Sequence, residues 1–567
     1  MANRNKWTAR KHAVNKFAQE KKANGKSMEN KKAAKKMAAE GNYQDAFADE
    51  ERAKKFPFKG AMPKQNDPQW YFKSPEVLKD VASYSFSKPL GTLLDITKMY
   101  PDQPVYQEPT TIPGVMSITI APSPGISVDA QSPVNLAAQN IYTRVRYKNS
   151  GAANYDPQDL MLYLLAMDSL YSAWNWLKRI YGFASSYSQL NRYRPKAYLL
   201  SNNFQPEDIM ANLADFRAYL NMAADRISAF CVPAVFTYNV RHSWLFSNVY
   251  TDSNTTKAQD YMYIPAFFYK YDETTSSDGG ILTPVPVCVV EPSSENHFTF
   301  EWARSMLDGM INALQYSEDI GNMSGDILKE FGDGNLFKLS HIDADYKVEP
   351  VYSSEVLPQI ENCLLLGHQE FVSKTDLSPF NITQDPNTNF IKYQPTWVAP
   401  TTPVTRAGTY LNFHWDNPTP ENTMLASRLA YNGIYLDGKY YITSCGSEIA
   451  LEATIWYFSQ GRSLTTPANS YSPLGTYYLH LNGMKYPQSF DSDADFVDWV
   501  HHTVMTNWLW NSFDWAPMME TAIYPTTGSN LIMPPMRDWD VFTFIDTGDI
   551  EAMNLLALLT EFDIPTT

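Results

Sequence analysis

Apolar side chains repeat at helical spacing in two segments of the first half of the chain. In residues 206–227 they follow one another at alternating steps of four and three, the period of one helix face. Pro157 and Pro206 stand where a first helical residue is expected, and Asp156 precedes Pro157 as an N-cap. The pattern predicts two helices with the buried faces Leu160, Leu164, Met167, Leu170, Tyr171, Trp174 and Leu177, and Ile209, Leu213, Phe216, Leu220, Ala223 and Ile227.

The pattern changes between about residues 231 and 290, where β-branched and aromatic runs are separated by turn residues. Val235–Tyr238 and Tyr261–Ile264 predict strands there, and Val115–Ile120 predicts one earlier. Helical spacing returns at 299–331, residues 335–445 are turn-rich, and two further helices are predicted at 493–513 and 548–561. The apolar positions of the last helix are Met553, Leu555, Leu556 and Leu559. The elements together predict an α+β fold.

The composition is that of a globular protein, because 44% of the 567 residues are hydrophobic and 19% are charged. No apolar run reaches the roughly 18–20 residues that cross a bilayer, since Asp168, Ser169 and Asn175 interrupt the longest candidate. The N-terminus lacks the apolar core of a secretory signal, so we expect synthesis in a cytoplasm. Four widely separated cysteines predict buried, reduced thiols: Cys231, Cys288, Cys363 and Cys445.

The charge is divided between two parts of the chain. Residues 1–64 hold 17 Lys and Arg against 7 Asp and Glu, a net charge of +10, whereas residues 65–567 carry −25. The first 40 residues have few apolar side chains to bury, so we expect a basic arm that is disordered when free. Pro57, Gly60, Pro63 and Pro68 mark its end.

The arm is the one segment whose chemistry points to a ligand. Its first 36 residues contain ten lysines and two arginines against Glu20 and Glu29, a ratio that favours point-charge contact with phosphates over recognition of bases. Binding should be sensitive to salt, blind to sequence and compatible with an A-form duplex. A basic tail for nuclear import or solubility is the alternative. The candidate RNA-binding residues are Arg4, Lys6, Arg10, Lys11, Lys16, Lys21, Lys22, Lys26, Lys31, Lys32, Lys35 and Lys36.

The sequence contains no complete motif of a known class of catalytic site. Gly25-Lys26-Ser27 lacks the earlier glycine and strand of a phosphate-binding loop, and no GxSxG, HExxH, CxxC or GxGxxG motif occurs. His501 and His502 are adjacent on a predicted helix and point about 100° apart, so they cannot share one ion well. The acidic residues 491–498 fit capping of that helix better than catalysis. We expect no catalytic residue, cofactor, metal or small-molecule substrate.

Aromatic residues are abundant and spread over the whole body: 36 Tyr, 29 Phe and 14 Trp. Tyr and Trp are favoured at protein interfaces, so we expect them in the core and in subunit contacts. Carbohydrate stacking is the alternative. A body at −25 repels a polyanion, so nucleic acid would be held by the arm alone. Many copies with inward-facing arms would form a container with a positively charged interior.

A distinctive string in the middle of the chain comprises Arg241–Asp252, Lys257–Gln259, Tyr261–Pro265 and Phe268–Tyr271. This string resembles the capsid proteins of picobirnaviruses. The total length, the basic arm and the acidic helical body are similar to that family as well. The resemblance implies a structural protein of the virion that forms symmetric homodimers, builds a non-enveloped icosahedral shell and encloses genomic double-stranded RNA.

The same resemblance implies a division into domains. We expect a basic arm at 1–64, a predominantly helical shell domain formed by 65–233 and 445–567, and a strand-rich projection domain at 234–444. The Pro-rich residues 99–135 are expected to be exchanged between dimer partners.

Two other functions remain compatible with the residues. An RNA-coating nucleoprotein would use the same arm without forming a closed shell, and a glycan-active enzyme or lectin would carry the arm incidentally. Contact of the released arm with membranes is a further hypothesis, although its apolar face is weak.

Overall fold

The structure is a computed structural model that describes residues 74–82, 93–94, 110–111 and 114–565, the last range with internal gaps of which 466–509 is the longest. The chain divides into two compact units. The first comprises residues 1–86 and 415–419, and its one described helix, α5 (Pro75–Ala82), is exposed throughout. The second comprises residues 87–414 and 420–567 and contains the other described elements.

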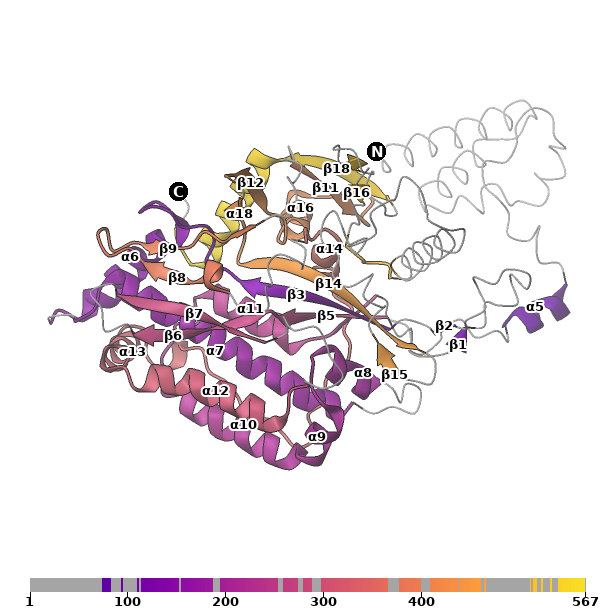
Figure 1. Cartoon of the computed structure of the whole chain (residues 1–567), viewed down its shortest axis with the longest axis horizontal. Coiled ribbons are helices and arrows are strands. Elements are labelled where there is room, and N and C mark those ends of the chain that lie inside the picture. The colour runs from indigo at the N-terminus through magenta and orange to yellow at the C-terminus, as the bar shows by residue number, and fades with distance from the viewer. Residues whose placement is uncertain are drawn as a thin grey trace, which may run out of the picture. The chain divides into compact units, whose positions relative to one another are not determined.

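A five-stranded sheet forms the centre of the second unit (Figure 1). Its middle strand β3 pairs antiparallel with β14 on one side and parallel with β5 on the other, so residues far apart in the sequence meet in one sheet. Every residue of β3 and β5 is buried, which suits their continuous apolar and aromatic runs. The strands, in sheet order, are β15 (Ser463–Thr465), β14 (Glu448–Ser459), β3 (Val115–Pro122), β5 (Asp260–Pro265) and β4 (Tyr250–Thr251).

The longest helix, α7 (Pro157–Ala184), is buried along nearly its whole length. It begins as predicted, because Pro157 needs no hydrogen-bond partner for its nitrogen and the Asp159 carboxylate accepts the Asp156 N–H at 2.8 Å. Its Trp174 indole donates to the Leu220 carbonyl at 2.8 Å. Polar side chains therefore fix the helix within an apolar core.

The other helices surround α7 and the sheet. The predicted helix from Pro206 is two helices that meet at Asn212, and the region 299–331 likewise divides near Ser317. The second of these ends where Gly332 adopts a φ of 73°, a conformation that favours glycine. The helices are α6 (Pro133–Lys148), α8 (Arg194–Ser201), α9 (Pro206–Ala211), α10 (Leu213–Ile227), α11 (Thr237–Ser247), α12 (Phe300–Gln315), α13 (Glu318–Phe331), α14 (Val356–Glu361), α16 (Pro420–Ala426) and α18 (Thr547–Glu561), with 3-10 turns at Asp333–Asn335 and Ser378–Phe380.

The prediction of a strand over Val235–Tyr238 is wrong, because α11 begins at Thr237. Tyr238 and His242 lie one helical turn apart on the face buried against α7, and their rings pack edge to face at 4.5 Å. A run of four β-branched and aromatic residues fits a strand or a buried helix equally, so only the packing partner decides between them.

The remaining strands form smaller sheets. The four-stranded sheet has the order β6-β7-β8-β9, and β6 packs against α7 and α12. A three-stranded sheet has the order β10-β13-β12, and three pairs complete the set: β1-β2, β11-β18 and β16-β17. Their bounds are β1 (Leu93–Leu94), β2 (Thr110–Thr111), β6 (Phe267–Glu273), β7 (Gly280–Pro286), β8 (Ile382–Gln384), β9 (Ile391–Lys392), β10 (Thr396–Val398), β11 (Gly408–Phe413), β12 (Asn432–Leu436), β13 (Lys439–Ser444), β16 (Ala522–Ile523), β17 (Leu531–Ile532) and β18 (Val541–Asp546).

The last predicted helix exists as α18, but its buried face differs from the prediction. Leu555 and Leu556 are exposed, whereas Ile550, Asn554 and Leu558 are buried. The buried face is the one that packs against neighbouring residues, since Ile550 contacts Leu364 and Ala430. The sequence pattern alone could not specify that direction.

Some of the other predictions are confirmed, and others concern residues outside the described ranges. The α+β fold is confirmed, as are the strands 115–120 and 261–264. Cys231, Cys363 and Cys445 are buried, reduced thiols, while Cys288 and nearly all of the predicted helix 493–513 lie outside the described residues. The division into shell and projection domains stays a prediction. Strand β5, from the predicted projection segment, pairs with β3 of the predicted shell.

Candidate functional site, a buried charge network

Six ionisable side chains from five parts of the chain meet beside the central sheet. Arg241 on α11 holds the carboxylate of Glu448, at the start of β14, through two hydrogen bonds: Nε donates to Oε1 at 2.5 Å and Nη2 to Oε2 at 3.1 Å. The Glu448 side chain is fully buried, whereas that of Arg241 is 19% exposed. Such a forked pair fixes the orientation of both groups and offsets their loss of hydration. Burial alone would raise the pKa of Glu448, but Arg241 and His242 outweigh it and hold that pKa below its usual range.

The imidazole of His242 lies between two carboxylates. Its Nδ1 is 2.7 Å from Asp168 Oδ2 of α7, and its Nε2 is 3.3 Å from Glu448 Oε1. Burial disfavours the imidazolium, but the two carboxylates outweigh burial and raise the pKa of His242 to about 10. The ring is therefore positively charged at neutral pH.

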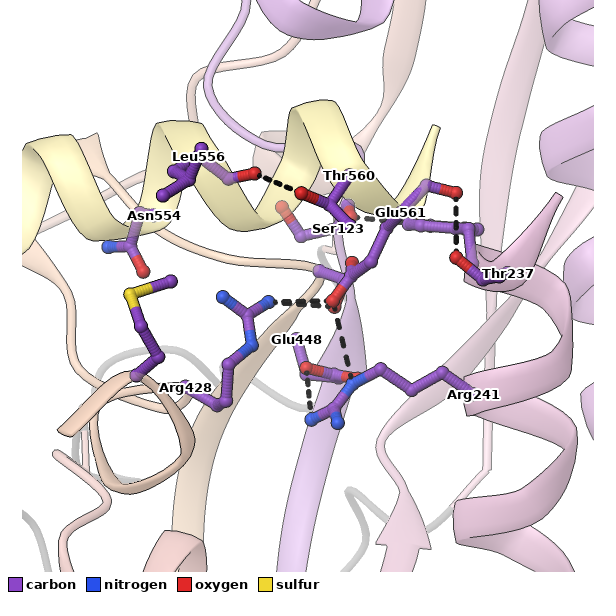
Figure 2. Close-up of polar contacts among 12 residues, drawn as sticks. Ser123, Thr237, Arg241, Arg428, Glu448, Asn554, Leu556, Thr560 and Glu561 are labelled. Atoms are coloured by element: carbon purple, nitrogen blue, oxygen red, sulfur yellow. Dashed lines mark hydrogen bonds and ion pairs between the residues drawn. The ribbon is translucent and has the colours of Figure 1, made fainter. Parts of the chain in front are cut away.

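The C-terminal helix joins the same network (Figure 2). The Glu561 carboxylate lies between Arg428 and Arg241: Arg428 Nη2 donates to its Oε1 at 2.9 Å, and Arg241 Nε is 3.9 Å from that oxygen. The Thr237 hydroxyl donates to the Glu561 carbonyl at 3.2 Å and ties α11 to α18 a second time. Burial raises the pKa of Asp168, and the neighbouring His242 opposes that shift. Three cations thus balance three anions when His242 is protonated and Asp168 is ionised.

The geometry of this network indicates a structural role. An Asp–His pair is also part of a catalytic triad, but here the second imidazole nitrogen faces Glu448 and His242 is 1% exposed. The neighbouring Cys445 thiol lies 3.3 Å from the Ser123 hydroxyl, and burial raises its pKa to about 12, which removes its nucleophilic character at neutral pH. The charge network joins α7, α11, β14 and α18.

A second buried carboxylate lies at the opposite end of the sheet's core strands. Asp260 begins β5, accepts the Tyr198 hydroxyl at 2.6 Å and lies 3.3 Å from Arg194 Nη2. Burial raises the pKa of Asp260 to about 7, and Arg194 opposes that shift only in part. A pKa near 7 means that this buried carboxyl group titrates close to neutral pH.

The residues predicted to bind RNA and those of the described site are different sets. All twelve basic candidates, Arg4 to Lys36, lie outside the described residues, as do His501, His502 and the acidic residues 491–498. No sequence motif predicted the charge network. Its one signal was the adjacent pair Arg241–His242, which carried the family resemblance without suggesting electrostatics.

Two features of the described residues bear on other functions. None of their helices is both long enough and apolar enough to span a bilayer. No cluster of three or more His, Cys, Asp or Glu side chains among them is arranged to hold a metal ion.

Three comparisons relate the chain to known proteins. The family model described as Picobirnavirus, Capsid protein matches residues 70–466. The capsid protein precursor of Human picobirnavirus is 35% identical over 334 residues, which are 57% of this chain and 59% of that relative, so the match spans less than two thirds of the relative's length. The X-ray crystallographic structure of the picobirnavirus capsid matches with a TM-score of 0.70 at 22% identity, over 88% of this chain and 99% of that one. At this identity the structural likeness shows the fold.

Proposed function

This chain belongs to the picobirnavirus capsid protein family, and we propose that it assembles as symmetric dimers into a closed icosahedral shell that packages double-stranded RNA through its basic arm. The observation that carries the RNA part is the charge division: +10 in residues 1–64 against −25 in the rest. Only the arm attracts a polyanion, so RNA is drawn to the arms and repelled by the body.

The shell part follows from the family and from the rigidity of the second unit. A capsid subunit must hold one shape while many weak contacts form, and the charge network ties five distant parts of the chain together. Breaking one buried pair costs about 3–5 kcal/mol, so local rearrangement of these elements is disfavoured. We infer a structural, non-catalytic role in the virion after synthesis in the host cytoplasm.

The alternative is a nucleoprotein that coats RNA without closing into a shell. The two functions give different particles, so electron microscopy of the purified full-length chain separates them. Uniform spheres support the shell, whereas filaments or irregular RNA complexes would support the nucleoprotein.

Arm function is tested by size-exclusion chromatography with absorbance at 260 and 280 nm. Deletion of residues 1–40 should leave particles that lack the 260 nm excess, and loss of particles would contradict the division of labour. A matched control permutes the order of residues 1–40 and keeps their composition. RNA content that survives permutation supports contact without sequence recognition.

A further inference from the structure

The paired strands β11 and β18 carry an exposed cluster of aromatic rings. Phe542 is 56% exposed, Phe544 48% and Tyr410 39%. The rings contact one another: Tyr410 lies 5.3 Å from Phe544 and 5.6 Å from Trp539 between centroids, and Trp539 lies 4.7 Å from Phe542. Four aromatic side chains thus form one continuous surface.

Strand register shows that Tyr410, Phe542 and Phe544 share the outer side of the pair. Tyr410 stands opposite Phe544, and directly opposed residues point to the same face. The opposite face of β11 carries Leu411 and Phe413, which are buried, whereas their partners on β18, Thr543 and Val541, are exposed. Core packing thus covers the β11 half of that face. On the other face Tyr410, Phe542 and Phe544 are exposed where a solvent-facing strand would carry polar side chains.

The area of this surface suits a protein contact. At about 200 Å² for a whole aromatic side chain, the exposed fractions of Phe542, Phe544 and Tyr410 sum to about 290 Å². A standard interface buries about 800 Å² per partner, of which about 450 Å² is apolar. Three rings thus supply roughly two thirds of the apolar area that a stable contact needs.

The surrounding charges and backbone favour protein over RNA as the occupant. Asp540 lies directly before β18, with its carboxylate 2.5 Å from the His414 imidazole, and Asp546 is the last residue of the strand. The Asp546 carboxylate accepts the Asp549 N–H and adds negative charge that repels phosphates. Among the described strands, β18 pairs with β11 alone, so one edge of its backbone faces away from β11. Such an edge pairs readily with a strand of another chain.

We propose that the outer face of β11–β18, formed by Tyr410, Trp539, Phe542 and Phe544, is a contact surface for a second copy of this chain. The proposal deepens the proposed function and rests on it, because a shell requires many contacts between identical subunits. Aromatic side chains near the centre of such a contact carry much of its affinity.

The test replaces the two most exposed rings together, F542S/F544S, in the full-length chain. The matched control, Y147S/Y316S, removes two tyrosines that are 87% and 79% exposed on α6 and at the end of α12. Circular dichroism checks folding, and analytical ultracentrifugation with electron microscopy measures self-association. We expect F542S/F544S to weaken association by at least about 100-fold and the control to leave it unchanged.

Each outcome bears on the proposal. A folded F542S/F544S protein that assembles like the wild type overturns this contact surface while the shell function stands. A wild-type chain that stays monomeric at all concentrations overturns both. Hydrogen exchange on the wild type needs no variant: amides of residues 541–546 should gain protection on assembly, and equal exchange in monomer and assembly contradicts the proposal.

Discussion

Replacement of His242 by Gln tests the charge network most directly. Gln has a similar length and keeps hydrogen-bonding capacity, but it removes the positive charge between Asp168 and Glu448. The remaining groups then carry one more buried negative charge than positive charge. Uncompensated buried charge is the costly case, so H242Q is expected to destabilise the folded chain.

The magnitude follows from the pKa of His242. Folding raises that pKa from 6.5 to about 10, and each unit corresponds to about 1.4 kcal/mol, so the charged imidazole contributes at most about 5 kcal/mol. Because the folded pKa is raised, this stability is fully present below pH 6.5 and is lost as pH rises through 10. Roughly 480 residues in the second unit give an unfolding entropy of about 1 kcal/mol per kelvin, so the shift in melting temperature is about 5 °C.

The assay is differential scanning calorimetry of wild type and H242Q at pH 6, 7, 8 and 9. The difference in apparent melting temperature should be largest at pH 6 and shrink by about 1 °C per unit above pH 6.5. His341 provides a control, because its ring lies 2.8 Å from Asp225 but its side chain is 60% exposed, so H341Q should not shift the melting temperature. A difference for H242Q that is independent of pH would refute the argument, since it would mean a neutral imidazole in the folded state.

Three further predictions use other parts of the second unit. The pKa of Asp260 is raised to about 7, so wild-type stability should fall from about pH 4 to 7; D260N should flatten this fall in a melting profile, and an unchanged slope would mean that Asp260 is already ionised. G182A would place a methyl group 2.6 Å from the Val348 side chain and should cost about 1–3 kcal/mol by calorimetry, whereas G321A, with open space around it, should not destabilise. E561Q should weaken the attachment of α18 and speed its hydrogen exchange; unchanged exchange would show that apolar packing alone holds the helix.

Much of the fold was predictable because local signals and packing agree. Pro157 and the acidic residues beside it mark the start of α7. The apolar residues along this helix predict its burial, because they would be unfavourable in water. The central strand 115–120 was likewise evident from its composition. Where an apolar run was short, as at Val235–Tyr238, local sequence fits helix and strand alike, and the packing of α11 against α7 decided the outcome.

The sequence by itself determined the charge division, the α+β class, the main helices and the family resemblance, because these depend on composition and on spacing between near neighbours. The tertiary structure decided which distant residues meet. Asp168, His242 and Glu448 are separated by long stretches of chain, and no periodicity relates them. The tertiary structure also decided that Phe542 and Leu555 are exposed, because the burial of an apolar residue depends on which other elements pack against it.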